Sequence, residues 1–263
     1  MPTFPTPDPV TARIDLAAGT VRVRAEERTT TEVEVRPANP AKTGDVQAAK
    51  ETRVEFADGR LLVTTPRRLR LMLFGPSASV EIDVRLPEGS ELHVESGFGD
   101  VDCDGRFADV RVASKAGDIR VDTAAGVTAR SSAGDVEVVR AEADVEAGTS
   151  YGQVRVGSAG GSMRLDSSAG DIWIDRALGS VHATTKYGQV RVVEAVRGSL
   201  WLETSYGTVE TGIRQGTAAW LDVQAGAGRV RNLLDAADGP DDAVETVEVR
   251  ARTAYGDVVV RRA

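Results

Sequence analysis

The chain has one cysteine and few aromatic residues, and each shortage excludes a class of protein. Cys103 has no second cysteine to pair with, so internal disulfides are excluded. Aromatic residues make up 5% of the 263 positions, which is few for a protein that must fill a wide core. The net charge is −8 with no concentration of positive charge to offset phosphate repulsion, so we expect no nucleic-acid partner.

Long hydrophobic runs are also missing. No window approaches 18 consecutive apolar residues, so we expect no membrane span. The first ten residues, MPTFPTPDPV, lack both a basic segment and an apolar one, which predicts no secretory signal. The sequence therefore predicts a cytoplasmic location.

Glycine and valine are abundant, and the glycines mark an internal repeat. A motif of eight residues recurs, in which a glycine is followed by a polar residue and then by two apolar positions separated by one residue. The glycine spacing stays between 17 and 19 residues from Gly99 to Gly207. The clear copies are SGFGDVDC (96–103), SKAGDIRV (114–121), SSAGDVEV (131–138), TSYGQVRV (149–156), SSAGDIWI (167–174), TKYGQVRV (185–192), TSYGTVET (204–211) and TAYGDVVV (253–260).

A second, weaker strand pattern lies between successive copies, as in ADVRV (108–112) and GSLWL (198–202). Each period thus holds two strands with one apolar face apiece. The sequence predicts an all-β, parallel β-solenoid (β-helix) with about 18 residues and two strands per rung, and an antiparallel meander is the alternative. The residues expected to point inward are Val101, Val112, Ile119, Val136, Val154, Ile172 and Val190.

Two domains are predicted, with residues 1–95 as an N-terminal β-strand cap module and residues 96–263 as the solenoid repeats. A cap is expected because the bare strand edge of a first rung invites aggregation. Within this module residues 37–50 show no apolar periodicity and are predicted to form a mobile loop. At the other end of the chain, Val258–Val260 is predicted to be an open edge.

The residue between the two apolar positions should point outward, and its charge mostly alternates in sign from one copy to the next. Rungs of a parallel stack lie about 4.8 Å apart, so opposite charges would lie side by side. We interpret this row as a solvated ladder that pairs with itself and not as a charged binding face. Its members are Asp102, Arg120, Glu137, Arg155, Trp173, Arg191 and Glu210.

The residues on either side of the repeated glycine are patterned too. Tyrosine or alanine precedes the glycine, and we expect the tyrosine rings to fill corners, where neighbouring alanines make room for them. Aspartate often follows the glycine, as in calcium-binding β-rolls, but paired glycines occur only at Gly160–Gly161. We therefore interpret the aspartates as turn residues that bond backbone N–H groups, and we predict no metal.

No constellation typical of catalysis is present. His93 and His182 lie in different regions, and Cys103 takes an inward position that predicts a buried, inert thiol. No nucleophile elbow, phosphate-binding loop or zinc motif occurs. We expect no cofactor and no enzymatic activity.

The lead-in LPEGSELHVESGFGDVDCDG (86–105), followed by SKAGDIRV and SSAGDVEV, resembles a bacterial β-strand-repeat family of unknown function whose members are regarded as candidate adhesins. The resemblance covers nearly the whole chain. It implies a β-solenoid with no established activity, cofactor or catalytic residues.

The function predicted from the sequence is that of a non-catalytic structural or protein-interaction solenoid, with a protein partner or self-association. The alternatives are a carbohydrate-binding or surface adhesive module that binds a glycan, and an acidic DNA-mimic inhibitor. A glycan-cleaving β-helix enzyme is disfavoured because no acid cluster is evident. The candidate interaction residues are Arg67, Arg68, Leu71, Phe74, Trp173 and Trp201.

Overall fold

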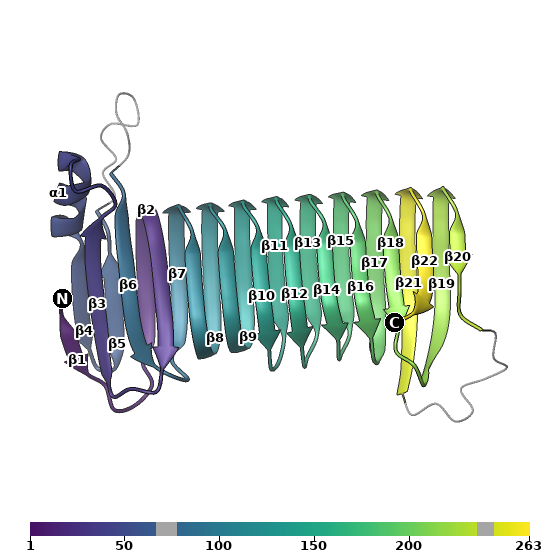
Figure 1. Cartoon of the computed structure of the whole chain (residues 1–263), viewed down its shortest axis with the longest axis horizontal. Coiled ribbons are helices and arrows are strands. Elements are labelled where there is room, and N and C mark those ends of the chain that lie inside the picture. The colour runs from purple at the N-terminus through teal and green to yellow at the C-terminus, as the bar shows by residue number, and fades with distance from the viewer. Residues whose placement is uncertain (67–77, 236–244) are drawn as a thin grey trace. The chain divides into compact units, whose positions relative to one another are not determined.

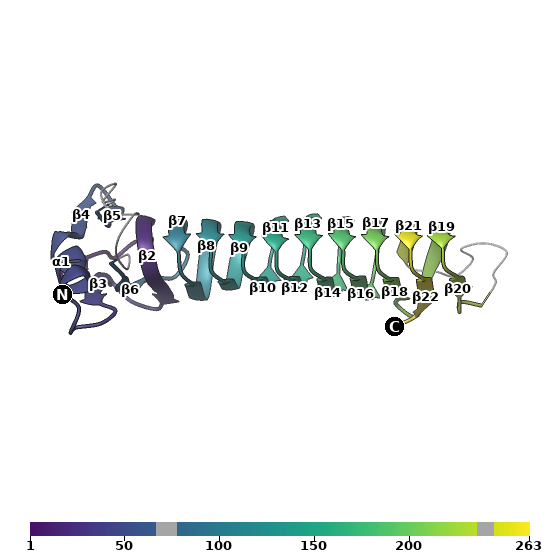
Figure 2. The ribbon, with the colours of Figure 1, turned by 90° about the horizontal axis from the view of Figure 1, so that it is seen from above.

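The computed structural model describes residues 1–66, 78–235 and 245–263 (Figures 1 and 2). Over these residues it has 22 strands and one helix. Strands account for 71% of the chain and helix for 4%, which confirms the all-β prediction. No helix in this described part is long and apolar enough to cross a membrane. The chain divides into two compact units, residues 1–125 with 129–133, and residues 126–128 with 134–263.

The first unit combines stacked parallel strands with an antiparallel cap. The helix α1 spans Thr43–Glu51. The strands are β1 (Thr3–Pro5), β2 (Thr11–Glu26), β3 (Thr30–Pro37), β4 (Arg53–Ala57), β5 (Arg60–Thr64), β6 (Val80–Pro87), β7 (Glu91–Phe98), β8 (Val101–Ala116) and β9 (Ile119–Ala133), the last of which contributes residues to both units.

Strand β2 forms a complete rung, because its two halves belong to different ladders. Its first half pairs in parallel with β5 and β7, and its second half pairs in parallel with β6 and β8. Beyond this rung the pairing turns antiparallel, in β3 with β6, β1 with β3 and β4 with β5. The first unit thus contains antiparallel pairs next to a parallel stack, and the division into a cap and a solenoid at residue 95 stays a prediction. The solenoid pattern itself already begins at β2, within the range predicted to be the cap.

The prediction of a loop over residues 37–50 is wrong for its second half, where α1 begins at Thr43. The reason is Asp45, whose side chain is 2% exposed. Its two carboxylate oxygens accept hydrogen bonds from the backbone N–H groups of Asn39 (3.1 Å) and Ser79 (3.0 Å). These bonds connect the helix to the backbone on both sides of it. Because hydrogen bonds of a polar side chain hold the helix, its sequence shows no apolar periodicity from which it could be predicted.

The second unit consists of two parallel ladders, seen as two layers in Figure 2. Its strands are β10 (Val136–Ala141), β11 (Val145–Tyr151), β12 (Val154–Ala159), β13 (Met163–Ala169), β14 (Ile172–Ala177), β15 (Val181–Tyr187), β16 (Val190–Ala195), β17 (Gly198–Tyr206), β18 (Val209–Ile213), β19 (Thr217–Ala227), β20 (Val230–Asn232), β21 (Glu245–Tyr255) and β22 (Val258–Arg262).

The register of these ladders is one repeat per rung. Val136 lies beside Val154, Val154 beside Ile172 and Ile172 beside Val190. Each step is 18 residues, so the parallel two-strand solenoid is confirmed and the antiparallel meander is excluded for this unit. All seven residues predicted to point inward are buried, with exposed fractions between 0% and 3%. Burial of each valine or isoleucine contributes about 1.5–3 kcal/mol to folding.

Two further sets of residues, each at the same position in successive rungs and here called columns, stabilise the corners of the second unit. A Ser or Thr three residues before five of the repeated glycines is buried and donates its hydroxyl to the carbonyl of the glycine in the neighbouring rung, at 2.9–3.2 Å. These hydroxyls satisfy carbonyls that would otherwise be buried without a partner. The donors are Thr149, Ser167, Thr185, Thr204 and Thr253.

The aspartates after the glycine bond backbone N–H groups, as the sequence predicted, but in the neighbouring rung. Asp135 Oδ1 accepts from Gln153 N and Asp171 Oδ1 accepts from Gln189 N, both at 2.7 Å. An aspartate in every rung would place like charges about 4.8 Å apart. From Asp135 to Gln189 the column alternates Asp with Gln, which keeps these carboxylates two rungs apart, whereas Asp118 N donates to the Asp100 carboxylate of the rung before it.

Spatial order and chain order differ near the C-terminus. β21 pairs with both β17 and β19, and β22 pairs with both β18 and β20. The chain's last rung is therefore inserted between two earlier ones. The expectation that Val258–Val260 forms an open edge is wrong, because β22 has a parallel partner on each side.

We expect Val136→Asp to lower the free energy of unfolding by ~3 kcal/mol or more, because the carboxylate would be buried without a partner. The matched control Glu137→Gln changes the next residue, which points outward, and should change it by less than about 0.5 kcal/mol. Urea denaturation followed by circular dichroism measures both. Equal effects of the two substitutions would contradict the inward and outward assignment.

The glycine column should be intolerant of a side chain. Gly170 has φ +152°, and a Cβ placed there would lie 1.8 Å from the carbonyl oxygen of Gly152 in the neighbouring rung. We expect Gly170→Ala to cost ~2 kcal/mol or more, from backbone strain and from separation of the rungs. Gly44→Ala is the control, because among the described residues its Cβ would meet nothing closer than the Ala78 Cβ at 3.8 Å, and alanine favours the helix. Thermal unfolding of both variants checks this, and an unchanged melting temperature for Gly170→Ala would contradict it.

Candidate interaction surface

The structure does not bring the predicted interaction residues together. Arg67, Arg68, Leu71 and Phe74 lie outside the described residues, so their role stays a prediction. Trp173 is on β14 and Trp201 is on β17, which belong to different ladders of the second unit. The two tryptophans therefore do not form one aromatic face.

Trp201 is the centre of a cluster that we call the Trp201 patch, made of Trp201, His182, Arg250 and Arg252. The register places His182, Trp201 and Arg250 side by side on β15, β17 and β21. The His182 ring stacks on Trp201 with 6.0 Å between centroids and 19° between planes. The guanidinium carbons of Arg250 and Arg252 lie 6.0 Å and 5.8 Å from the Trp201 ring. Two cations thus lie against one half-buried aromatic ring.

Acidic neighbours hold the arginines of this patch in place. Arg250 forms an ion pair with Glu248 at 2.7 Å, and Arg252 forms one with Asp222 at 3.6 Å. The indole Nε1 of Trp201 donates to Glu203 at 3.4 Å. A partially ordered surface of aromatic and guanidinium groups costs less conformational entropy when it binds a partner.

Trp173 lies in the predicted ladder of alternating charge on the other face. The guanidinium carbon of Arg191 is 5.1 Å from the Trp173 ring centroid. Arg191 also pairs with Glu210 at 3.5 Å, and Glu210 pairs with Arg261 at 2.9 Å. In these described rungs the ladder pairs with itself, as the sequence predicted, and each exposed pair contributes about 0–1 kcal/mol.

The tyrosines before the repeated glycine do not fill corners, which corrects the prediction from the sequence. Tyr187 stacks on Tyr206 with 5.1 Å between ring centroids, and Tyr206 stacks on Tyr255 with 4.8 Å. All three rings remain 49–59% exposed, and Tyr151 is 69% exposed. The rings stand outside the corner and pack on one another, because the register puts them one rung apart. We call this row, which continues through Ala169 and Ala227, the tyrosine column.

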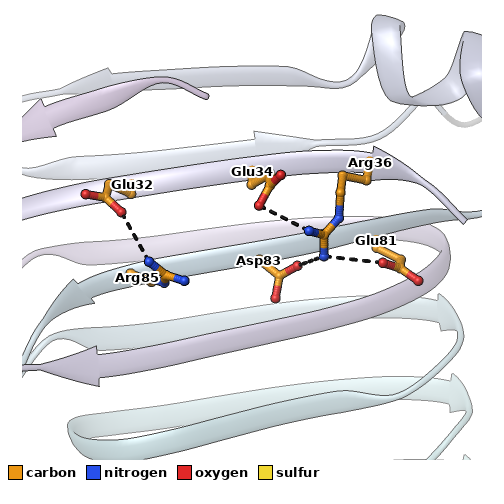
Figure 3. Close-up of polar contacts among 6 residues, drawn as sticks. All are labelled: Glu32, Glu34, Arg36, Glu81, Asp83 and Arg85. Atoms are coloured by element: carbon orange, nitrogen blue, oxygen red, sulfur yellow. Dashed lines mark hydrogen bonds and ion pairs between the residues drawn. The ribbon is translucent and has the colours of Figure 1, made fainter.

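The first unit carries a lattice of mixed charge where β3 pairs with β6 (Figure 3). Arg36 is its centre and contacts Asp83 at 2.6 Å, Glu34 at 3.3 Å and Glu81 at 3.4 Å. Arg85 contacts Glu32 at 3.7 Å. These antiparallel neighbours neutralise one another, so the lattice stabilises the pairing of β3 with β6 and gives no single-sign site.

Three titratable groups among the described residues have pKa values shifted by their surroundings. Cys103 is fully buried, and burial, aided by Asp102 and Asp104, raises the pKa of its thiol well above the ordinary value. Partial burial, with Asp104 nearby, raises the pKa of Asp102. Hydrogen bonds from the Ser162 backbone and hydroxyl lower the pKa of Asp144. Among the described residues no group of three or more His, Cys, Asp or Glu side chains is placed to hold a metal ion.

A hollow of about 710 Å³ lies beside the exposed ring of Trp220 on the outer face of the second unit. It is lined by Arg197, Glu245 and Glu248, among others, and Arg197 pairs with Glu245 at 3.5 Å. Its walls belong to the ends of β17 and β21, outside the valine-lined interior. Space for a ligand in this region is thus on the surface.

No curated protein matches the chain. Solved structures similar to the chain include a candidate adhesin from Bacteroides fragilis NCTC 9343 (12% identity, TM-score 0.39, covering 98% of this chain and 95% of that one) and another from Parabacteroides distasonis ATCC 8503 (11%, 0.36, 98% and 95%). A candidate cell adhesion protein from Clostridium sporogenes ATCC 15579 is also similar (11%, 0.28, 100% and 98%). At these TM-scores the superposition is poor, so family membership rests on the sequence match.

The family model described as Toastrack DUF4097 matches residues 12–261, which is nearly the whole chain. The match begins in β2, the first strand that forms a complete rung, and ends in β22. It confirms the resemblance drawn from the repeated motif, and the chain belongs to the Toastrack DUF4097 family.

Proposed function

We propose that this protein is a non-catalytic interaction protein that binds a protein partner, or a second copy of itself, through the outer surface of the solenoid. The observation that carries the proposal is the Trp201 patch, in which Arg250, Arg252 and His182 lie against one half-buried tryptophan. Tryptophan and arginine are the residues most enriched among those that dominate binding energy at protein interfaces.

The interior supports the same proposal. Its inward positions are filled by Val, Ile, Leu and Ala in successive layers, with exposed fractions close to zero. Catalysis needs titratable groups that converge on a bound substrate. The titratable groups of the described rungs lie in outward ladders and pair with neighbours such as Arg191 with Glu210, and the Cys103 thiol is buried.

Two alternatives from the sequence are less well supported. In the tyrosine column the faces of Tyr206 are covered by Tyr187 and Tyr255, so a sugar could stack only on the uncovered faces of rings such as Tyr151. A DNA mimic needs rows of carboxylates that imitate phosphates, whereas the rows here alternate Arg with Glu. The adhesive alternative differs from the proposal mainly in location, because both act by surface binding.

We expect Trp201→Ala to weaken binding of the partner by at least about tenfold, because the ring anchors both arginines. The full chain with a photo-crosslinker next to the patch, at Glu203, would be incubated in extract of its host bacterium, and the cross-linked protein would be identified and its affinity measured. Trp173→Ala is the matched control on the other ladder and should leave binding unchanged. Equal losses in the two variants, or a wild type that cross-links to nothing and turns over a substrate, would contradict the proposal.

The proposal includes action in the cytoplasm. Fractionation of host cells with an antibody to the full chain should recover the protein with cytoplasmic markers. Recovery on the cell surface would favour the adhesive module instead.

A further inference from the structure

The tyrosine column of the second unit contains a gap of one rung. Tyr151, Ala169 and Tyr187 are register partners on β11, β13 and β15. Tyr151 and Tyr187 are thus two rungs apart, about 10 Å at ~4.8 Å per rung, and the residue of the column between them is Ala169. The exposed fraction falls from 69% at Tyr151, which has no neighbouring ring, to 49% at Tyr206, which has two. The ring faces of Tyr151 and Tyr187 that look toward Ala169 are therefore open to solvent.

The same column shows what fits such a gap. Tyr206 lies between Tyr187 and Tyr255, with 5.1 Å and 4.8 Å between ring centroids and planes within 6° and 2° of parallel. Tyr187 and Tyr255 are also two rungs apart. A planar ring from outside, placed above Ala169, would have the spacing to Tyr151 and Tyr187 that Tyr206 has to its own neighbours. Offset stacked rings at 4.5–7 Å are a favourable arrangement.

The backbone groups at the floor of the gap are already engaged. Gly152 N–H donates to the Ala169 carbonyl at 3.0 Å, and Gly170 N–H donates to the Tyr187 carbonyl at 2.8 Å. The Asp171 carboxylate next to it already accepts from Gln189 N. A sugar, which needs hydrogen-bond partners for its hydroxyls, would find these backbone groups engaged. A nucleotide phosphate would meet the negative charge of Asp171 and a chain of net charge −8.

We propose that the gap between Tyr151 and Tyr187 is a binding slot for one aromatic side chain of a protein partner. The slot rests on the proposed function in one respect, that the partner is a protein. It lies on a different row from the Trp201 patch, so the two can be tested separately. The ring would be held by stacking on two faces and by contact with the Ala169 methyl group, and the slot would select Phe, Tyr or Trp over aliphatic side chains.

The test is a titration of the full chain, labelled with 13C at alanine methyl groups, with N-acetyltryptophanamide. The Ala169 methyl resonance should shift in a saturable way, because the methyl group would lie against the edge of the bound ring. An apparent Kd on the order of 1 mM is expected for a single side chain. N-acetylleucinamide should cause no such shift. Absence of a saturable shift with the tryptophan probe up to its solubility limit would overturn the slot.

Two substitutions and one matched control make the test specific. Ala169→Tyr should fill the slot as Tyr206 fills its own place, raise the melting temperature and reduce binding of the probe at least tenfold. Tyr151→Ala removes one of the two stacking rings and should weaken binding of the probe several-fold. This substitution adds no ring, so its result does not depend on how a new side chain packs. Ala227→Tyr adds a ring beyond Tyr255, at the other end of the column, and should leave binding at Ala169 unchanged. Binding that survives both Ala169→Tyr and Tyr151→Ala would overturn the proposal.

Other ligands and the Trp201 cross-linking experiment separate the remaining outcomes. Methyl β-glucoside and adenosine monophosphate should not shift Ala169 at concentrations where the tryptophan probe does, and a stronger response to either would overturn the assignment to an aromatic side chain. If the probe binds the slot but no protein cross-links at Glu203, the slot stands as a site for an aromatic ring and the Trp201 patch fails as the docking surface. If a protein cross-links at Glu203 but the probe does not shift Ala169, the proposed function stands and the slot fails.

Discussion

The structure depends on one constraint, the parallel stacking of equivalent positions about 4.8 Å apart. Each residue in the second unit has its counterpart from the neighbouring rung beside it, so every column must be compatible with itself. Valine satisfies this in the core, where Val136 packs beside Val154. At the corner only glycine satisfies it, because a Cβ at Gly170 would overlap the Gly152 carbonyl. Carbonyls at the corner in turn require the column of Ser and Thr hydroxyls.

The same constraint determines what the outer surface can carry. Like charges in one column repel, so Arg191 is followed by Glu210 and Asp135 by Gln153. Aromatic rings in one column attract, so Tyr187, Tyr206 and Tyr255 stack. A charged face of one sign is therefore unfavourable on this fold, whereas aromatic rows are favourable. This is the physical reason why recognition on this surface would use rings and guanidinium groups more readily than a strongly charged patch.

Much of the fold was predictable from the sequence, because the repeat shows its constraint directly. The inward valines, the 18-residue rung, the buried thiol of Cys103 and the pairing of Arg191 with Glu210 all follow from period and alternation. The helix α1 was not predictable in this way, because it depends on bonds between the Asp45 carboxylate and the distant backbone of Ser79. The exposed stacking of the tyrosines was not predicted. Rings packed inside a corner and rings stacked outside it give the same sequence pattern, so the pattern does not distinguish the two. Only part of the Trp201 patch could be predicted from the sequence. Arg250 and Arg252 lie near Trp201 because β17 pairs with β21 and not with β19, the next strand of this ladder in the chain.

That pairing also shows why rung order is hidden in a repeat sequence. The motifs around Gly207 and Gly256 are nearly equivalent, so either fits beside the rungs before them, and local pattern does not choose between them. The looser copy around Gly228 (QAGAGRVR, 224–231) differs. The register places Ala225 beside Thr253, where other copies have a buried Ser or Thr, and Asn232 beside Val260, where most copies have an apolar residue. This copy forms the end of β19 and β20, each of which has a parallel partner on one side in the described residues, and Val230 there is 44% exposed. An end rung buries one side fewer, so it gains less from large inward residues than an inner rung does. Degeneration of the motif, more than position in the chain, thus indicates which rung lies at the end of the stack.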